Sequence, residues 1–303
     1  MSNTATRIIV ALIAAPIIIG LVIAGHWWFW GFVQLLALLS LKELYDLGTN
    51  TSALPQYWTG YAGSLLIGLY FMLADTAPQA FAQLLFPALV LSFVLGVLII
   101  ELLRNKPHPL WNAAITIFGV MYIGTCVTSL VGLRMAFTGR MLSAPVLQPF
   151  LSNSSLEERL HIGNVWGTWL VFVTFLSIWT CDSLAFFAGK AFGNHKLFPR
   201  VSPNKSWEGA IVGFLGASIL FLVLSRYLLP FLPPLHAVVL GGIVGAIGQL
   251  GDLVESLFKR DAGVKDSSNI IPGHGGVYDR FDAAMFVAPV VYLYIHFFLL
   301  FAR

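Results

Sequence analysis

Long runs of apolar residues, interrupted by short polar stretches, occupy most of this chain. Charges and Pro/Gly clusters divide them into nine runs. The runs cover residues 8–25, 27–41, 58–74, 80–103, 110–134, 164–190, 208–229, 235–258 and 282–302. Because a helix of about 20 apolar residues crosses a bilayer, each run predicts one transmembrane helix. The first run is too long for the apolar part of a usual signal peptide, and a second run follows at once, which favours a retained span.

The composition predicts the same class, an all-α polytopic integral membrane protein. Of the 303 residues, 58% are hydrophobic and 10% are charged, and the mean hydropathy is +0.83. Soluble proteins are about a quarter charged, so a soluble enzyme and a disordered chain are both excluded. The net charge is +3 with no basic stripe, and no nucleic-acid partner is expected. Cys126 and Cys181 lie inside apolar runs, which offers neither a disulfide framework nor a CxxC metal site.

Basic residues divide unequally between the two sides of the predicted topology. The loops that follow runs two, four, six and eight hold 11 of the 17 Lys and Arg residues. These residues are Lys42, Arg104, Lys106, Lys190, Lys196, Arg200, Lys205, Lys259, Arg260, Lys265 and Arg280. The positive-inside rule therefore places these loops on the cytoplasmic side and both termini outside. We expect the cytoplasmic (inner) membrane as the location, with a polar cavity open to the cytoplasmic side.

Carboxylates lie inside two predicted spans, where a charged side chain costs about 3 kcal/mol. One helix face at the end of run 235–258 is polar over three turns. Its residues are Gln249, Asp252, Ser256 and Lys259, with Glu255 beside them. Such a stripe faces a water-filled cavity or a bound cation rather than lipid. Run 164–190 carries Asp182. A structural ion pair, Asp182 with Lys190 or Asp252 with Lys259, is the alternative interpretation.

The connection between the last two runs combines glycines, basic residues and carboxylates. Glycines around His274, including Gly275 and Gly276, let backbone N–H groups approach an anion closely. Asp279 and Asp282, three residues apart, share a helix face and suit a hard divalent cation. Four side chains supply positive charge for phosphate oxygens: Lys259, Arg260, Lys265 and Arg280. Together these residues describe a metal–polyphosphate site.

The connection before run 208–229 repeats this theme. Lys205 precedes Ser206, the predicted N-cap of the next helix, and the free N–H groups of a helix start form an anion seat. An ordinary capped helix with a solvent-directed lysine is the alternative. His195 and His274 lack metal-ligand spacing to each other, so loop roles rather than a zinc site are expected for them.

The stretch from Ser256 to Asp282 resembles the C-terminal signature of the phosphatidate cytidylyltransferases, or CDP-diacylglycerol synthases. That signature has S-x-x-K-R, then K-D, then H-G-G-x-x-D-R-x-D. Its elements are present at Ser256, Lys259-Arg260, Lys265-Asp266, His274-Gly275-Gly276, Asp279-Arg280 and Asp282. Residues 248–256 and 202–209 also look like this family, as does Asp182 followed by Phe187-x-Gly189-Lys190, although Leu184 replaces a small residue.

The resemblance implies a nucleotidyltransferase that makes CDP-diacylglycerol and pyrophosphate from CTP and phosphatidate in phospholipid biosynthesis. It implies Mg²⁺ held by Asp252 and Asp279, a second cation such as K⁺ beside it, and a homodimer. We expect catalytic roles for Asp252, Asp279, Lys259 and Arg280. We expect phosphate binding by Lys190, Lys205, Ser206, Arg260, Lys265, His274, Gly275 and Gly276. Supporting polar roles fall to Asp182, Gln249, Glu255, Ser256 and Asp282.

Three regions are predicted along the chain. Residues 1–135 form a five-helix transmembrane region, 136–163 an extracytoplasmic loop, and 164–303 a four-helix catalytic transmembrane region. Within the loop, residues 156–160 are expected to make a short helix on the surface.

Three other classes of protein fit the sequence less well. A cation-coupled transporter also places carboxylates in its spans, but no internal repeat is visible and the glycine–basic loop serves it no purpose. A CDP-alcohol phosphotransferase is disfavoured because the chain contains no Asp-Gly pair for its signature. A purely structural membrane scaffold leaves the motif residues unexplained.

Overall fold

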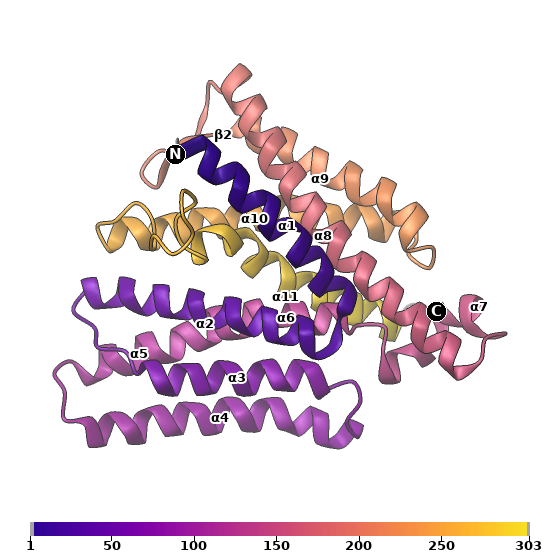
Figure 1. Cartoon of the computed structure of the whole chain (residues 1–303), viewed down its shortest axis with the longest axis horizontal. Helices are drawn as coiled ribbons and strands as arrows, with labels where there is room; N and C mark the ends of the chain where they lie inside the picture. Colours follow the sequence, from indigo (N-terminus) through magenta and orange to yellow (C-terminus); the bar gives the residue numbers. More distant parts are fainter. Residues whose placement is uncertain (1–2, 302–303) are drawn as a thin grey trace. The chain divides into compact units, whose positions relative to one another are not determined.

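The computed structural model describes residues 3–301, apart from the side chains of residues 3–9, 11, 140, 300 and 301. All nine predicted runs lie on helices (Figure 1). The first four helices are α1 (Asn3–Ala24), α2 (His26–Asn50), α3 (Tyr57–Leu73) and α4 (Gln79–Arg104). The fifth run is a continuous helix made of α5 (Pro109–Gly119), the π-helical turn η1 (Val120–Gly124) and α6 (Thr125–Arg134). The last four are α8 (Leu156–Phe192), α9 (Trp207–Leu228), α10 (Pro234–Asp261) and α11 (Tyr278–Phe301).

Six helical segments are long and apolar enough to cross a membrane. They are Gln79–Arg104, Pro109–Arg134, Leu156–Phe192, Trp207–Leu228, Pro234–Asp261 and Tyr278–Leu299. The apolar window of the first is only 6% buried within the protein, as expected for a helix that faces lipid. The prediction of an all-α integral membrane protein is confirmed. The count of nine crossings stays a prediction, because α1, α2 and α3 are absent from this set among the described residues.

The chain forms two compact units, and the first comprises Met1–Gly132 and Phe258–Phe281. Within it, α2, α3 and α4 run side by side, with α5 against them (Figure 1). A buried carboxylate ties their ends together. Glu101 of α4 is 5% exposed and accepts hydrogen bonds from Gln56 Nε2 (2.7 Å), Asn112 Nδ2 (2.7 Å) and Arg104 Nη1 (2.9 Å). This network satisfies a buried charge with three donors.

The second unit comprises Leu133–Leu257 and Asp282–Arg303. Its α8 and α9 form an antiparallel helical hairpin (Figure 1). Two short antiparallel strands join them, β1 (Lys196–Phe198) and β2 (Ser202–Ser206), with Lys196 opposite Ser206. Gly213 of α9 faces the carbonyl oxygen of Cys181 on α8, where a Cβ would lie 2.7 Å from that oxygen. Absent side chains therefore allow this close helix contact.

The expectation of a short surface helix at residues 156–160 is wrong. These residues form the first turn of the 37-residue helix α8. Ser155 caps it in a capping box: the Ser155 hydroxyl accepts from Glu158 N, and the Glu158 carboxylate accepts from Ser155 N. The apolar run marks only the membrane-spanning part of this helix, and α8 already begins in the polar turns that precede the run. Before it, the described chain makes η2 (Gly139–Ser143), η3 (Pro145–Leu147) and α7 (Gln148–Leu151).

Candidate active site

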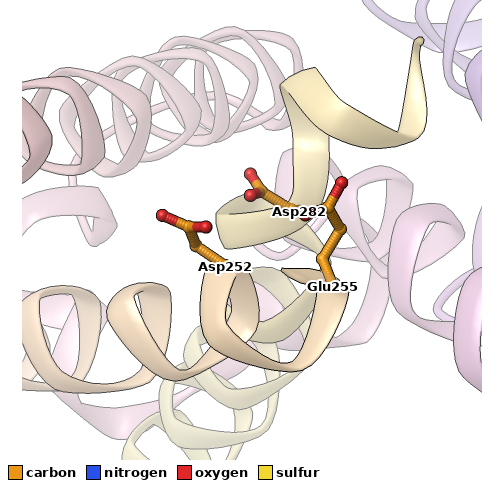
Figure 2. Close-up of side chains that lie close together, drawn as sticks. All are labelled: Asp252, Glu255 and Asp282. Atoms are coloured by element: carbon orange, nitrogen blue, oxygen red, sulfur yellow. The ribbon is translucent and has the colours of Figure 1, made fainter. Parts of the chain in front are cut away.

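Three carboxylates gather in the second unit. Asp252 and Glu255 project from α10 toward Asp282 at the start of α11 (Figure 2). One ligand oxygen from each residue lies within 4.8 Å of the other two. Carboxylates this close repel one another unless a cation or a proton lies among them. Oxygen ligands are also what Mg²⁺ prefers. The three side chains therefore fit a divalent cation.

A glycine brings α10 and α11 close enough to form this cluster. A Cβ on Gly251 would lie 2.7 Å from Asp282 O and 3.1 Å from Phe286 Cβ, so any larger residue would push α11 away. Gly251 directly precedes Asp252, and the close approach is therefore made beside the cluster itself. The cluster includes Asp282, whose position beside Asp279 had suggested a divalent cation, and Glu255, for which a supporting polar role was predicted.

Lys205 supplies a positive charge at the cluster. Its Nζ lies 2.6 Å from Asp252 Oδ2, and the two side chains are 24% and 36% exposed. The next residue, Ser206, is the N-cap of α9, and its hydroxyl accepts from Gly209 N at 3.2 Å. The predicted cap is confirmed.

The other polar residues of the α10 face have identifiable contacts. The Ser256 hydroxyl donates to Asp252 Oδ1 at 3.4 Å. Gln249 Nε2 donates to Ala210 O of α9 (3.1 Å) and to Gly245 O within its own helix (2.6 Å). Ser256 thus orients a carboxylate of the cluster, and Gln249 fixes α10 against α9.

The ion pairs in the structure join other partners than the two alternatives considered from the sequence. Among the described residues no ion pair joins Asp182 to Lys190, whose side chains are both exposed. Asp252 pairs with Lys205, and Lys259 pairs with Asp279 (Nζ–Oδ1 2.9 Å). His195 has the loop role predicted for it, because its Nδ1 lies 2.6 Å from Glu208 Oε1.

In the first unit, the loop between α10 and α11 folds around Asp279. This carboxylate is 3% exposed. It accepts from Ser267 N (3.1 Å) and Gly276 N (2.8 Å) in addition to its ion pair with Lys259. Gly275 has a φ of +85°, a backbone conformation that favours glycine. The glycine-rich turn therefore brings N–H groups to an anion, and the anion in the structure is a carboxylate of the chain itself.

Four predicted phosphate-binding groups are exposed basic side chains. Lys190, Arg260, Lys265 and Arg280 all lie on the surface. Arg260 Nη1 donates to Val264 O at 3.1 Å, and His274 Nδ1 lies 3.4 Å from Pro272 O. Their assignment to phosphates stays a prediction. The Asp252–Asp279 metal pair also stays a prediction, since Asp252 belongs to the second unit and Asp279 to the first.

Sequence reasoning missed Glu43 of α2. Its side chain is fully buried and accepts hydrogen bonds from Ser267, Ser268, Val277 and Tyr278. It lies two residues past the predicted span 27–41, in what was expected to be a loop, whereas α2 continues to Asn50. Extending the helix by its periodicity would have placed a lone carboxylate on a buried face.

The fold and the acidic cluster define a helical membrane protein with a candidate cation site. A family model described as "Cytidylyltransferase family" matches residues 5–298, and the chain belongs to that family. The resemblance found in its motifs is thereby confirmed.

Proteins named phosphatidate cytidylyltransferase are similar over most of the chain. The Staphylococcus haemolyticus protein is 32% identical over 94% of this chain and 96% of its own length. The Synechocystis protein is 32% identical over 95% of both chains. "Phosphatidate cytidylyltransferase 5, chloroplastic" of Arabidopsis thaliana is 30% identical over 91% of this chain and 68% of its own length.

Proposed function

We propose that this chain is a phosphatidate cytidylyltransferase, which makes CDP-diacylglycerol and pyrophosphate from CTP and phosphatidate. The observation that carries the proposal is the family match over residues 5–298, with relatives of that name at similar length. The apolar helices suit an enzyme with one substrate in the bilayer and another in water. A place in the cytoplasmic membrane and a cytoplasmic active site are parts of the proposal that rest on the sequence, and the homodimer is proposed from the family resemblance alone.

The acidic cluster suits the metal that the family resemblance implies. Asp252, Glu255 and Asp282 offer three carboxylate oxygens, the donor type that Mg²⁺ takes. When bound, such an ion neutralises negative charge on phosphate oxygens. Asp279 as a second metal residue beside Asp252, and K⁺ as a second cation, are proposed from the resemblance alone.

The reaction does not require the protein to remove a proton from the attacking group. A phosphate oxygen of phosphatidate is ionised at neutral pH, so it can attack the α-phosphorus of CTP without a strong general base. As that P–O bond forms, the bond from the α-phosphorus to the oxygen that bridges to the β-phosphorus breaks, and pyrophosphate leaves with the bond's electrons. The protein must align two polyanions in line and offset their repulsion.

The basic side chains have the task of binding phosphates. The ion pair of Lys205 with Asp252 keeps its ammonium beside the cluster, which supports a role for Lys205 in binding a phosphate there. Arg260, Lys265 and Arg280 are exposed and supply further charge on the loop before α11. No covalent enzyme intermediate is needed.

The position of a radioactive label tests the reaction directly. The full chain in detergent, with Mg²⁺ and phosphatidate, should convert [α-³²P]CTP into lipid-soluble label. With [γ-³²P]CTP, the label should leave as pyrophosphate and stay in the aqueous phase. Lipid-soluble label from the γ position would indicate phosphate transfer instead, and no lipid-soluble label from either CTP would contradict the proposal.

A further inference from the structure

The Glu43 carboxylate of α2 is saturated by donors from a distant segment of the chain. Glu43 is 0% exposed. Oε1 accepts from Ser268 Oγ (2.6 Å) and Val277 N (3.0 Å). Oε2 accepts from Ser267 Oγ (2.9 Å) and Tyr278 N (2.8 Å). Two donors on each oxygen stabilise a charge that would otherwise be costly to bury.

Two of these donors belong to the start of α11. The first N–H groups of a helix have no partner within the helix, and a carboxylate beside them is favoured by the helix dipole. Val277 N and Tyr278 N are such groups, because α11 begins at Tyr278. Glu43 therefore caps α11 from another helix, and the next residue of α11 is Asp279.

The remaining contacts connect Glu43 to Asp279 through shared residues. Ser267 donates its hydroxyl to Glu43 and its N–H to Asp279. Gly276 donates its N–H to Asp279, and a Cβ on Gly276 would collide with Glu43 Oε2 and Ser267 Oγ. The glycine is thus required by the closeness of Glu43. Each of the two carboxylates therefore accepts from Ser267 at one end of this segment and from residues 276–278 at the other.

We propose that Glu43 is a positioning residue for the reaction: it sets the conformation of residues 267–278 and, through them, the place of Asp279 and its partner Lys259. The proposal rests on the proposed function, in which these two residues take part. Glu43 is fully buried with four donors of the chain around its carboxylate, so it acts through these residues.

Glu43→Gln tests this role with little change of shape. An amide can offer only one oxygen, so its NH₂ must face Val277 N or Tyr278 N, and neither backbone N–H can turn into an acceptor. We expect kcat/KM per folded molecule to fall on the order of 10- to 100-fold, as for residues that orient metal ligands. The matched control is Glu101→Gln, which alters another buried carboxylate with several donors in the same unit. It should lower the Tm and leave kcat/KM per folded molecule unchanged.

Hydrogen exchange separates this proposal from the proposed function. In the substrate-free full chain, amides of residues 264–280 should exchange on the order of tenfold faster in Glu43→Gln and unchanged in Glu101→Gln. This measurement stands even if the wild type lacks cytidylyltransferase activity, a result that would remove the proposed function alone. Unchanged exchange, or a kinetic loss no larger than that of Glu101→Gln, would overturn the role of Glu43.

A milder variant covers the case in which Glu43→Gln cannot be purified. Ser268→Ala removes one donor and keeps the carboxylate and both of its backbone contacts. It should accelerate exchange in the same residues and lower kcat/KM by a smaller factor. Wild-type values for both quantities would contradict the proposal.

Discussion

At the scale of single residues, Asp252 has neighbours of both charges. Its carboxylate pairs with the Lys205 ammonium and also belongs to a cluster with Glu255 and Asp282. Lys205 lies at the Asp252 end of this cluster, and three carboxylates so close together favour a bound cation. Asp279 is different, because its carboxylate accepts from two backbone N–H groups and pairs with Lys259.

Asp252→Asn and Asp282→Asn should each abolish turnover and the gain of thermal stability with Mg²⁺. A ligand at about 100 times its Kd adds roughly 2.7 kcal/mol to the free energy of unfolding, and a variant that cannot bind it gains nothing. Without metal, each variant should be at least as stable as the wild type, since one repulsive charge is removed. Melting in detergent with and without Mg²⁺, beside the activity assay, measures both effects.

Asp279→Asn provides the contrast within the same experiment. It should melt earlier than the wild type even without metal, because weakening a buried, charge-assisted set of hydrogen bonds costs about 1–3 kcal/mol. If Asp279 is also a metal residue, the Mg²⁺ gain disappears as well. A Mg²⁺ gain of wild-type size in Asp279→Asn would exclude it as a ligand, and the same result in Asp252→Asn would refute the cluster.

At the scale of elements, the helix caps place the ends of α8 and α9. Ser155 and Ser206 both accept a hydrogen bond from a backbone N–H of the helix that follows. Ser155 is exposed, whereas Ser206 is 4% exposed and precedes a helix that starts beside Lys205. The same local interaction therefore serves only the fold in one case and a proposed phosphate seat in the other.

Ser206→Ala should lower the free energy of unfolding by about 1 kcal/mol, and Ser206→Gly by a few tenths. If the helix start also binds a phosphate, Ser206→Ala should raise the KM for CTP as well. Ser155→Ala is the matched control, with a similar loss of stability and an unchanged KM. Equal KM values in Ser206→Ala and Ser155→Ala would reduce Ser206 to a helix cap.

Apolar runs were enough to predict every long helix. In a bilayer, a single run of about 20 apolar residues can satisfy all of its backbone hydrogen bonds internally only as a helix. Helix ends were less predictable where polar turns extend them, as at residues 156–160 and at the end of α2. The candidate site divides in the same way. Asp252 and Asp279 lie in or beside one recognisable sequence motif. The role of Glu43 depends on hydrogen-bond partners more than 220 residues away, which no local pattern indicates.

At the scale of the whole molecule, the number of membrane crossings depends on the first three helices. The helix α3 has 17 residues, or about 26 Å at 1.5 Å per residue, close to the thickness of about 30 Å that a span must cover. Nine crossings require the loops on either side of α3 to face opposite sides of the membrane.

Cysteines at Ser52 and Thr76 test whether α3 crosses. In a background without Cys126 and Cys181, Ser52→Cys should react with a membrane-impermeant reagent from the cytoplasmic side and Thr76→Cys only from the other side. Both positions are exposed in the structure. Asn269→Cys, also exposed, is the cytoplasmic reference. Labelling of Ser52→Cys and Thr76→Cys from one side would show that α3 does not cross.

The separation of Glu43 from its partners also orders events during synthesis. The carboxylate emerges from the ribosome 224 residues before Ser267, which at about 5–20 residues per second is a delay of roughly 10–45 s. During that interval the Glu43 carboxylate of α2 has none of its four native hydrogen-bond donors. The native contacts of Glu43 can form only after α3 to α10 and the loop that follows them have been made, so this early part of the chain is among the last to reach its native state.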